Sequence, residues 1–301
     1  MRIAVLGAGG VGGYFGGRLA AAGSDVTFIA RGAHLAAIKA NGLRIVSALG
    51  DASIDVKAVD DIAKVDTVDL IVVAVKLWDT EVVAPALKPL VDRGAAVVSF
   101  QNGVTKDDIL RAHVRADAVM GGVSYIAARI AEPGVIEHTG TMQRLVFGEF
   151  DGSRSPRALA FLQACETAKI DAELSTSIKR VTWEKFVFLV GLSGATSFFR
   201  LPVGDIRVDP EKRAFLRGAM QETVAVGRAR GVALDAQYAD DRLAFCDTLP
   251  PTMTSSMYTD LMRGNRLELP WLSGAVVDMG RRAGIPTPVN EQIVEALTAA
   301  C

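Results

Sequence analysis

The stretch Ile3-Ala4-Val5-Leu6-Gly7-Ala8-Gly9-Gly10-Val11-Gly12 decides the fold of this chain. Its apolar beginning, residues 3–6, has the length of a buried parallel strand. That strand ends in a G-x-G-x-x-G motif, and a helix-like segment, residues 14–22, follows at once. A second apolar strand, residues 25–30, completes a β-α-β unit, so the order of elements predicts a dinucleotide-binding turn.

Each motif glycine has a predicted task in such a turn. Gly7 permits the tight turn, Gly9 lets the backbone approach a pyrophosphate, and Gly12 lets the helix pack closely on the strand. The amino end of the helix offers unpaired N–H groups and a partial positive charge to the phosphates. The residues expected to hold the cofactor here are Gly7, Ala8, Gly9, Gly10, Val11 and Gly12. The alternative is a plain glycine-rich turn, in a chain that has 29 glycines.

The end of the second strand indicates which dinucleotide is bound. NAD-binding units usually carry Asp or Glu there, to hold the ribose 2′-hydroxyl. Here Arg31 follows the strand, and Asp25 lies too early, at its beginning. A carboxylate would repel a 2′-phosphate, whereas a guanidinium can pair with it through two charge-assisted hydrogen bonds. We therefore expect NADP(H) as the cofactor; the alternative for Arg31 is a solvated surface arginine.

The composition excludes several classes of partner. The chain has 301 residues, enough for two domains, and a formal net charge of -1. A nearly balanced charge favours neither nucleic acid nor a membrane surface as a partner. We find no apolar run long enough to cross a bilayer, and no secretory signal before the first strand. We expect a cytoplasmic protein, and the sequence leaves its oligomeric state open, a homodimer included.

Cysteine and histidine residues form no pattern that would bind a metal ion. The three cysteines lack metal-ligand spacing and an obvious disulfide arrangement, which suits a reducing compartment. The three histidines are scattered along the chain, and we expect them to be structural or exposed. These residues are Cys165, Cys246, Cys301, His34, His113 and His138.

The first half of the chain alternates apolar strands with helices, which is typical of a parallel, doubly wound sheet. Further strands are predicted at residues 43–46, 54–56, 69–75, 95–100, 118–120, 125–128, 135–136 and 144–147. After a turn-rich break at residues 151–156 the patterns become helical. We expect an α/β Rossmann-type domain that binds NADP over residues 1–170, and an all-helical substrate and catalytic domain over residues 171–301.

Seven features in order give the chain a resemblance to the ketopantoate reductase (2-dehydropantoate 2-reductase) family over nearly its full length. They are the glycine motif, Arg31, Lys76 at a strand end, Gln101-Asn102-Gly103, Trp183-Glu184-Lys185, Ser255-Ser256-Met257 and Glu268. The resemblance implies NADPH-dependent reduction of a small 2-oxo acid or ketone.

The resemblance also implies how the cofactor is held. Arg31 and Lys76 would face the adenosine end of NADP, and the backbone near Ala127 would touch the cofactor. Asn102 would lie where nicotinamide and substrate meet. Glu268 would bind the cofactor from the second domain.

The reaction itself needs a proton donor, because hydride addition to a ketone builds negative charge on oxygen. The resemblance gives this role to Lys185 and substrate binding to Ser256, with Asn102 orienting the substrate. From the residues alone, Lys185 could equally be a lysine whose stem lies along an amphipathic helix. Likewise, Asn102-Gly103 could be ordinary turn chemistry, and Lys76 a solvated loop lysine.

The chain departs from the family pattern where the substrate would bind. Three asparagines that follow the proton donor in that pattern correspond here to Leu189, Ser193 and Val203, of which Ser193 keeps a hydroxyl that could bind substrate. Loss of these amides should weaken recognition of a hydroxylated substrate such as ketopantoate. We therefore expect a reductase of this kind with an altered, more apolar substrate.

Three other functions stay open at this point. The first is ketopantoate reduction proper, in pantothenate biosynthesis, with other groups replacing the asparagines. The second is an NADP(H)-binding redox sensor without turnover. The third is an opine or hydroxyacid dehydrogenase of similar two-domain build.

Overall fold

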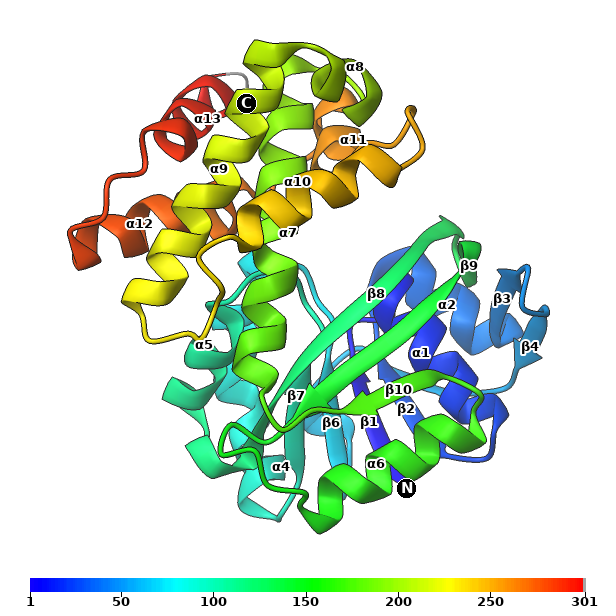
Figure 1. The fold of residues 1–301 in the computed structure, drawn as a ribbon. Helices are drawn as coiled ribbons and strands as arrows, with labels where there is room; N and C mark the ends of the chain where they lie inside the picture. The colour runs from blue at the N-terminus through cyan, green and yellow to red at the C-terminus, as the bar shows by residue number, and fades with distance from the viewer. Residues whose placement is uncertain (300–301) are drawn as a thin grey trace. The chain divides into compact units, whose positions relative to one another are not determined.

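The computed structural model describes residues 1–299 of the chain, which form two compact units. The first unit joins Met1–Asn102 with Lys106–Ile178, and the second joins Gly103–Thr105 with the chain from Lys179 onward (Figure 1). Each unit has its own hydrophobic core. These units differ from the ranges expected from the sequence at residues 103–105 and 171–178.

The first unit is built on one sheet of ten strands. They are β1 (Arg2–Leu6), β2 (Asp25–Ile29), β3 (Leu43–Ser47), β4 (Ala52–Ile54), β5 (Lys57–Val59), β6 (Leu70–Val73), β7 (Ala96–Ser99), β8 (Val119–Glu132), β9 (Val135–Gly148) and β10 (Asp171–Leu174). The order along the sheet is β4-β3-β9-β8-β7-β6-β1-β2-β5, and β10 pairs with β9. From β5 to the beginning of β8 the pairing is parallel, which confirms the predicted Rossmann-type sheet.

The strand order reverses beside β1. The chain passes from β1 outward to β2 and β5, then crosses over to β6 and continues outward to β7 and β8. Residues Ile3, Ala4 and Val5 of β1 are fully buried, as expected for a central strand covered on both faces. The carboxyl ends of β1 and β6 therefore flank the crevice where open α/β sheets bind their ligands.

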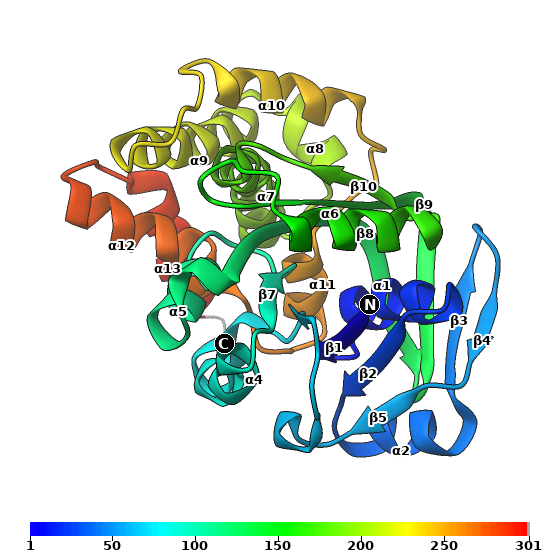
Figure 2. The same cartoon turned by 90° about the horizontal axis from the view of Figure 1, so that it is seen from below.

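The first unit carries helices on both faces of its sheet. They are α1 (Gly10–Ala21), α2 (Gly32–Asn41), α3 (Thr80–Val83), α4 (Lys88–Asp92), α5 (Lys106–His113) and α6 (Pro156–Thr167). Helix α1 packs very closely on the sheet (Figure 2), because a Cβ on Gly13 would lie 2.8 Å from the Ile136 side chain and one on Gly16 would lie 2.7 Å from Phe28. The several glycines of α1 therefore bring its amino end close to the strand ends.

Strands β8 and β9 form a long antiparallel hairpin where the sequence predicts four short strands. Their register is broken between Ile126 and Ala128, so that Ala127 has no partner in the ladder. Beyond this bulge β8 is largely exposed and carries Arg129 and Glu132, so it lacks the apolar run that marks a strand in the sequence. The four residues of β10 were missed for the same reason, since only Leu174 is buried.

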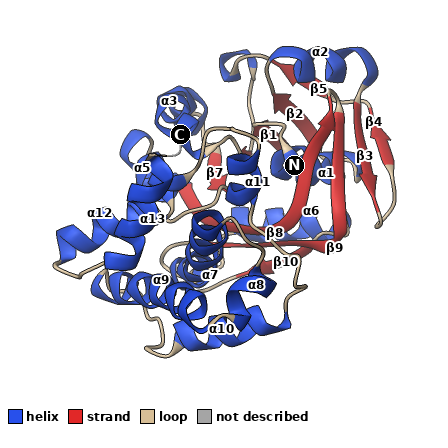
Figure 3. Cartoon of the chain, turned by 90° about the horizontal axis from the view of Figure 1, so that it is seen from above, coloured by secondary structure: helices blue, strands red, loops and turns tan. Residues whose placement is uncertain are grey.

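The second unit contains helices but no regular strand within the described residues (Figure 3). They are α7 (Ile178–Phe199), α8 (Val203–Val208), α9 (Pro210–Ala229), α10 (Tyr238–Thr248), α11 (Ser256–Met262), α12 (Ser273–Ala283) and α13 (Pro288–Thr298). This confirms the predicted helical C-terminal domain. Across residues 1–299, no helix combines the length and apolar character needed to cross a bilayer.

Candidate functional site

The turn after β1 can be made only with glycine at two positions. Gly7 has a φ of +102°, and a Cβ there would lie 2.7 Å from the backbone nitrogen of Val75. A Cβ on Gly12 would lie 2.1 Å from the Gly7 carbonyl oxygen. The Gly7 N–H donates to the Ile29 carbonyl over 3.0 Å, which ties the turn to the end of β2. Tight turning at Gly7 and close packing at Gly12 agree with the tasks expected of them.

Gly9 differs because the space around it is open. Apart from its own atoms and those of its two chain neighbours, no atom of residues 1–299 lies within 4 Å of the position that a Cβ on Gly9 would occupy. Gly9 is the N-cap residue of α1, and its carbonyl accepts the Gly13 N–H over 2.6 Å. Within residues 1–299, no hydrogen bond uses the Gly9 N–H as a donor. An open N–H at the amino end of a twelve-residue helix suits an anionic group.

The bulge in β8 meets the same turn. A Cβ on Gly10 would lie 2.1 Å from the Ala128 carbonyl oxygen, so α1 begins directly against this part of β8. Ala127, exposed at the bulge, is adjacent to that contact. The structure thus brings the backbone near Ala127 beside the glycine turn, although its role in cofactor binding stays a prediction.

Arg31 lies at the beginning of α2, where the chain leaves β2. It is the N-cap residue of the helix, in extended conformation, and its side chain is exposed. No ion pair of the described residues involves Arg31. One turn further, the His34 ring contacts the glycine turn, with Nε2 at 2.8 Å from the Ala8 carbonyl oxygen. No local pattern in the sequence indicates this contact, because it joins residues 26 positions apart.

The loop after β6 is fixed from the neighbouring strand end. The Gln101 amide donates to the Val75 carbonyl over 2.9 Å and to the Thr80 hydroxyl over 2.8 Å. Its oxygen accepts from the Ser99 hydroxyl. Lys76, which follows Val75, is exposed, and its amine lies 5.4 Å from the centre of the Trp78 ring. Buried Gln101 therefore sets the loop that carries Lys76.

A buried charge lies close to Asn102 in the chain. Lys106, fully buried, donates to the carbonyls of Ser99 and Gly122 and pairs with Asp107 at 2.9 Å. Burial raises the pKa of the Asp107 carboxyl, although Lys106 acts in the opposite direction. Asn102 itself is half-buried. The Lys106–Asp107 pair could not be recognised from the sequence, because a Lys-Asp dipeptide at the beginning of a helix is ordinarily solvated.

In the second unit, Lys185 lies on α7 and is half-buried. Its neighbours Trp183 and Phe186 are buried in the core, with their ring centres 5.6 Å apart. Leu189 and Ser193 follow at four-residue spacing, so helix geometry puts all three on one face of α7. Along this face the side chains become less exposed, from half-buried at Lys185 and Leu189 to fully buried at Ser193.

The hydroxyl of Ser193 has no hydrogen-bond partner among the described residues. Val203, which corresponds to another expected asparagine position, is fully buried in the core of the helical unit. Leu189 is only partly buried against that core. The three altered positions thus differ in access, and Leu189 is the most accessible of them.

Ser256 and Glu268 are also in the second unit. Ser256 is the exposed first residue of α11, whereas the buried Ser255 caps this helix by accepting the Tyr258 N–H over 3.0 Å. The Ser255 hydroxyl also lies 3.1 Å from that of Thr196 on α7. Glu268 is half-buried and precedes a short 3₁₀ helix, residues 269–271. The roles of Ser256 and Glu268 stay predictions.

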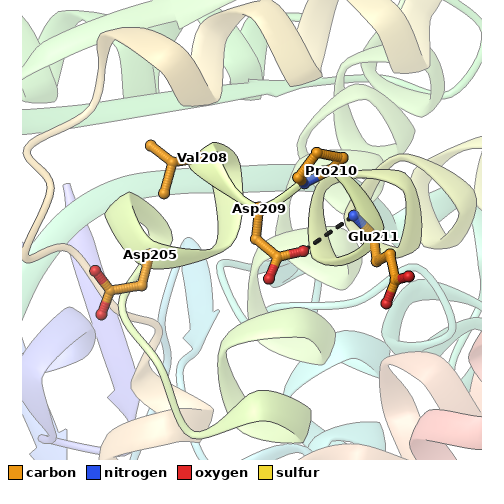
Figure 4. Close-up of a pocket in the computed structure, with 5 residues that line it drawn as sticks. All are labelled: Asp205, Val208, Asp209, Pro210 and Glu211. Carbon is orange, nitrogen blue, oxygen red and sulfur yellow. Dashed lines mark hydrogen bonds between the residues drawn. The ribbon is translucent and has the colours of Figure 1, made fainter.

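Two surface hollows contain none of the predicted site residues. The first lies where α8 meets α9 (Figure 4), and its lining includes the carboxylates of Asp205, Asp209 and Glu211. Asp209 caps α9 by accepting the Glu211 N–H over 3.0 Å. The second hollow lies at the amino ends of β1, β6 and β7, opposite the edge that carries the glycine turn. Neither hollow contains the residues expected to bind the dinucleotide or to donate a proton to the substrate. The acidic lining of the first hollow would also repel an anionic substrate.

Side chains that could bind a metal ion are scattered within residues 1–299. No group of three or more His, Cys, Asp or Glu side chains there could hold a metal ion. Cys165 and Cys246 are buried thiols, and burial raises their pKa to about 12 and about 11. Cys301 lies outside the described residues.

Comparisons of sequence show what the whole chain resembles. The family model "Ketopantoate reductase PanE/ApbA" matches residues 3–152, and "Ketopantoate reductase PanE/ApbA C terminal" matches residues 177–300. A 2-dehydropantoate 2-reductase of Halobacterium salinarum is 32% identical and covers 100% of this chain and 99% of its own length. An uncharacterized oxidoreductase of Bacillus subtilis, YkpB, is 30% identical over 97% of this chain and 96% of its own length.

Solved structures agree with these sequence matches. The crystal structure of a PanE/ApbA family ketopantoate reductase from Ralstonia eutropha JMP134 has a TM-score of 0.91 and 33% identity, covering 100% of this chain and 98% of that one. A D-mandelate dehydrogenase with NADH and anilino(oxo)acetate has a TM-score of 0.89 at 21% identity, covering 100% and 98% of the two chains. That second likeness supports the fold alone.

Proposed function

The chain belongs to the ketopantoate reductase family of oxidoreductases, and from this membership we propose that it reduces a 2-oxo acid or related ketone to the hydroxy product with NADPH. The observation that carries the proposal is the turn after β1. There Gly9 leaves an open space and an N–H that has no acceptor among the described residues, at the amino end of α1 and beside the point where the strand order reverses.

The residues of the turn fit a dinucleotide. A pyrophosphate can approach Gly9 because Gly9 has no Cβ and no side chain within the described part of the chain fills that space. Arg31 stands exposed at the end of β2, where a ribose 2′-phosphate would need a positive partner. When bound, the reduced nicotinamide would supply the hydride.

The chain's own contribution to the chemistry is a proton. Lys185 would donate it to the carbonyl oxygen as negative charge develops there. Asn102 would orient the substrate and nicotinamide, and Ser256 would hold a polar group of the substrate. An exposed Ser256 and a half-buried Lys185 suit contact with a ligand.

The substrate we propose is more apolar than ketopantoate. The accessible position on the Lys185 face of α7 is Leu189, which offers no hydrogen bond. A substrate with a hydroxyl near Leu189 would leave that hydroxyl unpaired once water is excluded, which is costly. An aliphatic or aromatic substituent would instead gain from burial against Leu189.

Ketopantoate itself is the second candidate. It is favoured by relatives such as the 32% identical Halobacterium protein, which is a 2-dehydropantoate 2-reductase. The exposed Ser256 hydroxyl could supply a polar contact in place of the missing amides.

A panel of 2-oxo acids with NADPH and with NADH tests both candidates. Loss of reduced-cofactor absorbance is followed for ketopantoate and for 2-oxo acids with aliphatic or aromatic side chains. The proposal predicts the highest kcat/KM for an apolar 2-oxo acid with NADPH. A highest value for ketopantoate would support the second candidate, and tight NADPH binding without turnover of any substrate would indicate a sensor.

A further inference from the structure

We infer that His34 is a positioning residue of the cofactor site, which fixes the glycine turn relative to the helix that carries Arg31. This inference rests on the proposed binding of a dinucleotide at that turn. His34 lies in the first turn of α2, three residues after Arg31, and is half-buried.

The hydrogen bonds of His34 define a single state of its ring. The Gly134 backbone N–H, which can only donate, lies 3.0 Å from Nδ1, so Nδ1 must be unprotonated. The proton of the neutral ring is then on Nε2, which donates to the Ala8 carbonyl over 2.8 Å. The ring therefore joins three segments: the turn at Ala8, the helix α2 and the tip of the β8–β9 hairpin at Gly134.

Fixing the Ala8 carbonyl also fixes the Gly9 N–H. In a planar trans peptide the C=O of one residue and the N–H of the next point in opposite directions. The bond from His34 holds the Ala8 C=O toward α2, so the Gly9 N–H points away from α2. This is the N–H that no other group of the described residues uses, beside the open space at Gly9. The His34 ring thus orients the Gly9 N–H, the donor that would contact a pyrophosphate.

The same ring links this donor to Arg31. Both His34 and Arg31 belong to the beginning of α2, so the His34 bond sets the spacing between the turn and the Arg31 backbone. NADPH would contact both places, through its pyrophosphate and its 2′-phosphate, whereas NADH lacks the second group. Loss of His34 should therefore weaken NADPH binding more than NADH binding.

The experiment measures the Kd of NADPH and of NADH for the full chain, together with kcat and KM in the best assay of the substrate panel. His34→Ala is expected to raise the Kd of NADPH about tenfold, as for a lost positioning hydrogen bond, with kcat at saturating NADPH unchanged. His34→Gln should recover most of the affinity, because its amide offers both a donor and an acceptor. In an Arg31→Ala background, His34→Ala should weaken NADPH and NADH binding equally.

His138 provides the matched control. It is buried in the same unit, and its ring also makes two hydrogen bonds, with the Ser47 hydroxyl and the Met142 carbonyl, neither of which belongs to the turn. His138→Gln is expected to change thermal stability and leave the ratio of NADPH to NADH affinity as in the wild type.

The two hypotheses fail differently. If the wild-type chain binds NADPH and the His34→Ala chain binds it equally well, the role of His34 is wrong and the proposed function stands. The role is also wrong if His138→Gln changes the ratio of affinities as much as His34→Ala does. A wild-type chain that binds neither dinucleotide would overturn the proposed function, and this inference with it.

Discussion

At the scale of single residues, charge at the end of β2 should decide the choice of cofactor. Arg31→Asp replaces a group that can pair with a 2′-phosphate by one that repels it. We expect the ratio of kcat/KM for NADPH to that for NADH to fall by roughly two orders of magnitude, because about 1.4 kcal/mol corresponds to each tenfold change and both attraction and repulsion are altered.

The control for this change is Arg154→Asp. Arg154 is exposed in the same unit, in the turn before α6, and its replacement alters net charge equally. Equal cofactor preference in the Arg31→Asp chain and the wild type would remove Arg31 from the 2′-phosphate site.

Lys185 should affect the rate of turnover rather than the binding of NADPH. Lys185→Ala is expected to lower kcat by about two to four orders of magnitude, the usual range for removal of a general acid, with the Kd of NADPH within about threefold of wild type. Steady-state kinetics and cofactor titration measure the two effects separately. Lys179→Ala, which changes an exposed lysine earlier on α7, should leave kcat unaltered. If Lys185→Ala kept full turnover, the proton donor would have to be sought elsewhere.

At the scale of elements, two glycines of the turn from β1 into α1 should have different roles, Gly9 in cofactor binding and Gly12 in folding. Gly9→Ala adds a methyl group in open space, so the melting temperature should stay near that of the wild type while the Kd of NADPH rises at least about tenfold. Gly12→Ala adds the same methyl group 2.1 Å from the Gly7 carbonyl oxygen, so it should lower the melting temperature. Thermal melting and cofactor titration test the pair. If the Gly9→Ala and Gly12→Ala chains had equal melting temperatures, or bound NADPH with equal affinity, this division of roles would be wrong.

The Lys185 face of α7 should set the substrate. Leu189→Asn returns an amide to the accessible position of that face, so kcat/KM for ketopantoate is expected to rise about tenfold or more and that for apolar 2-oxo acids to fall. Leu189→Ala serves as the control, because it removes the leucine without adding an amide. If kcat/KM for ketopantoate rose in the Leu189→Ala chain and not in the Leu189→Asn chain, space at this position rather than hydrogen bonding would limit the turnover of ketopantoate.

Some elements could be predicted from the sequence and others could not. The β1–α1–β2 unit was predicted because its apolar runs and glycines have strong local patterns, and Gly7 and Gly12 adopt the geometry that those patterns require. The β8–β9 hairpin was divided into four strands because Gly121 and Gly122 interrupt the apolar pattern of β8, and because residues 139–142 of β9 are exposed. The contacts of His34, Gln101 and Lys106 join residues far apart in the chain, so no local pattern could indicate them.

At the scale of the whole molecule, acid should weaken the fold through several ion pairs. Hydrogen bonds from Arg2, Arg217 and Arg213 lower the pKa of the carboxyls they contact, those of Asp69, Asp240 and Asp247. Since these folded pKa values lie below the unfolded value of about 3.9, the pairs stabilise the fold above that pH, and the contribution is lost as the pH falls through the folded values.

The melting temperature should therefore fall between about pH 5 and pH 3, and less steeply in high salt, which screens exposed pairs. Asp240→Asn should flatten this part of the profile, because the neutral amide no longer titrates. A melting temperature that is constant over this range would show that the pairs contribute nothing measurable.

The division into two units has a consequence for synthesis of the chain. Residues 103–105 belong with the helical unit, where Val104 packs against the core, yet they lie between β7 and α5 of the sheet unit. On the ribosome this segment is made long before α7 and the helices after it. Val104 therefore lacks its core neighbours until those helices have been made. The peptide that links Asn102 to Gly103 can then reach its final conformation only after α7 and the helices that follow it have been made. We therefore expect the nascent sheet unit to form early and to acquire its finished Asn102 loop last.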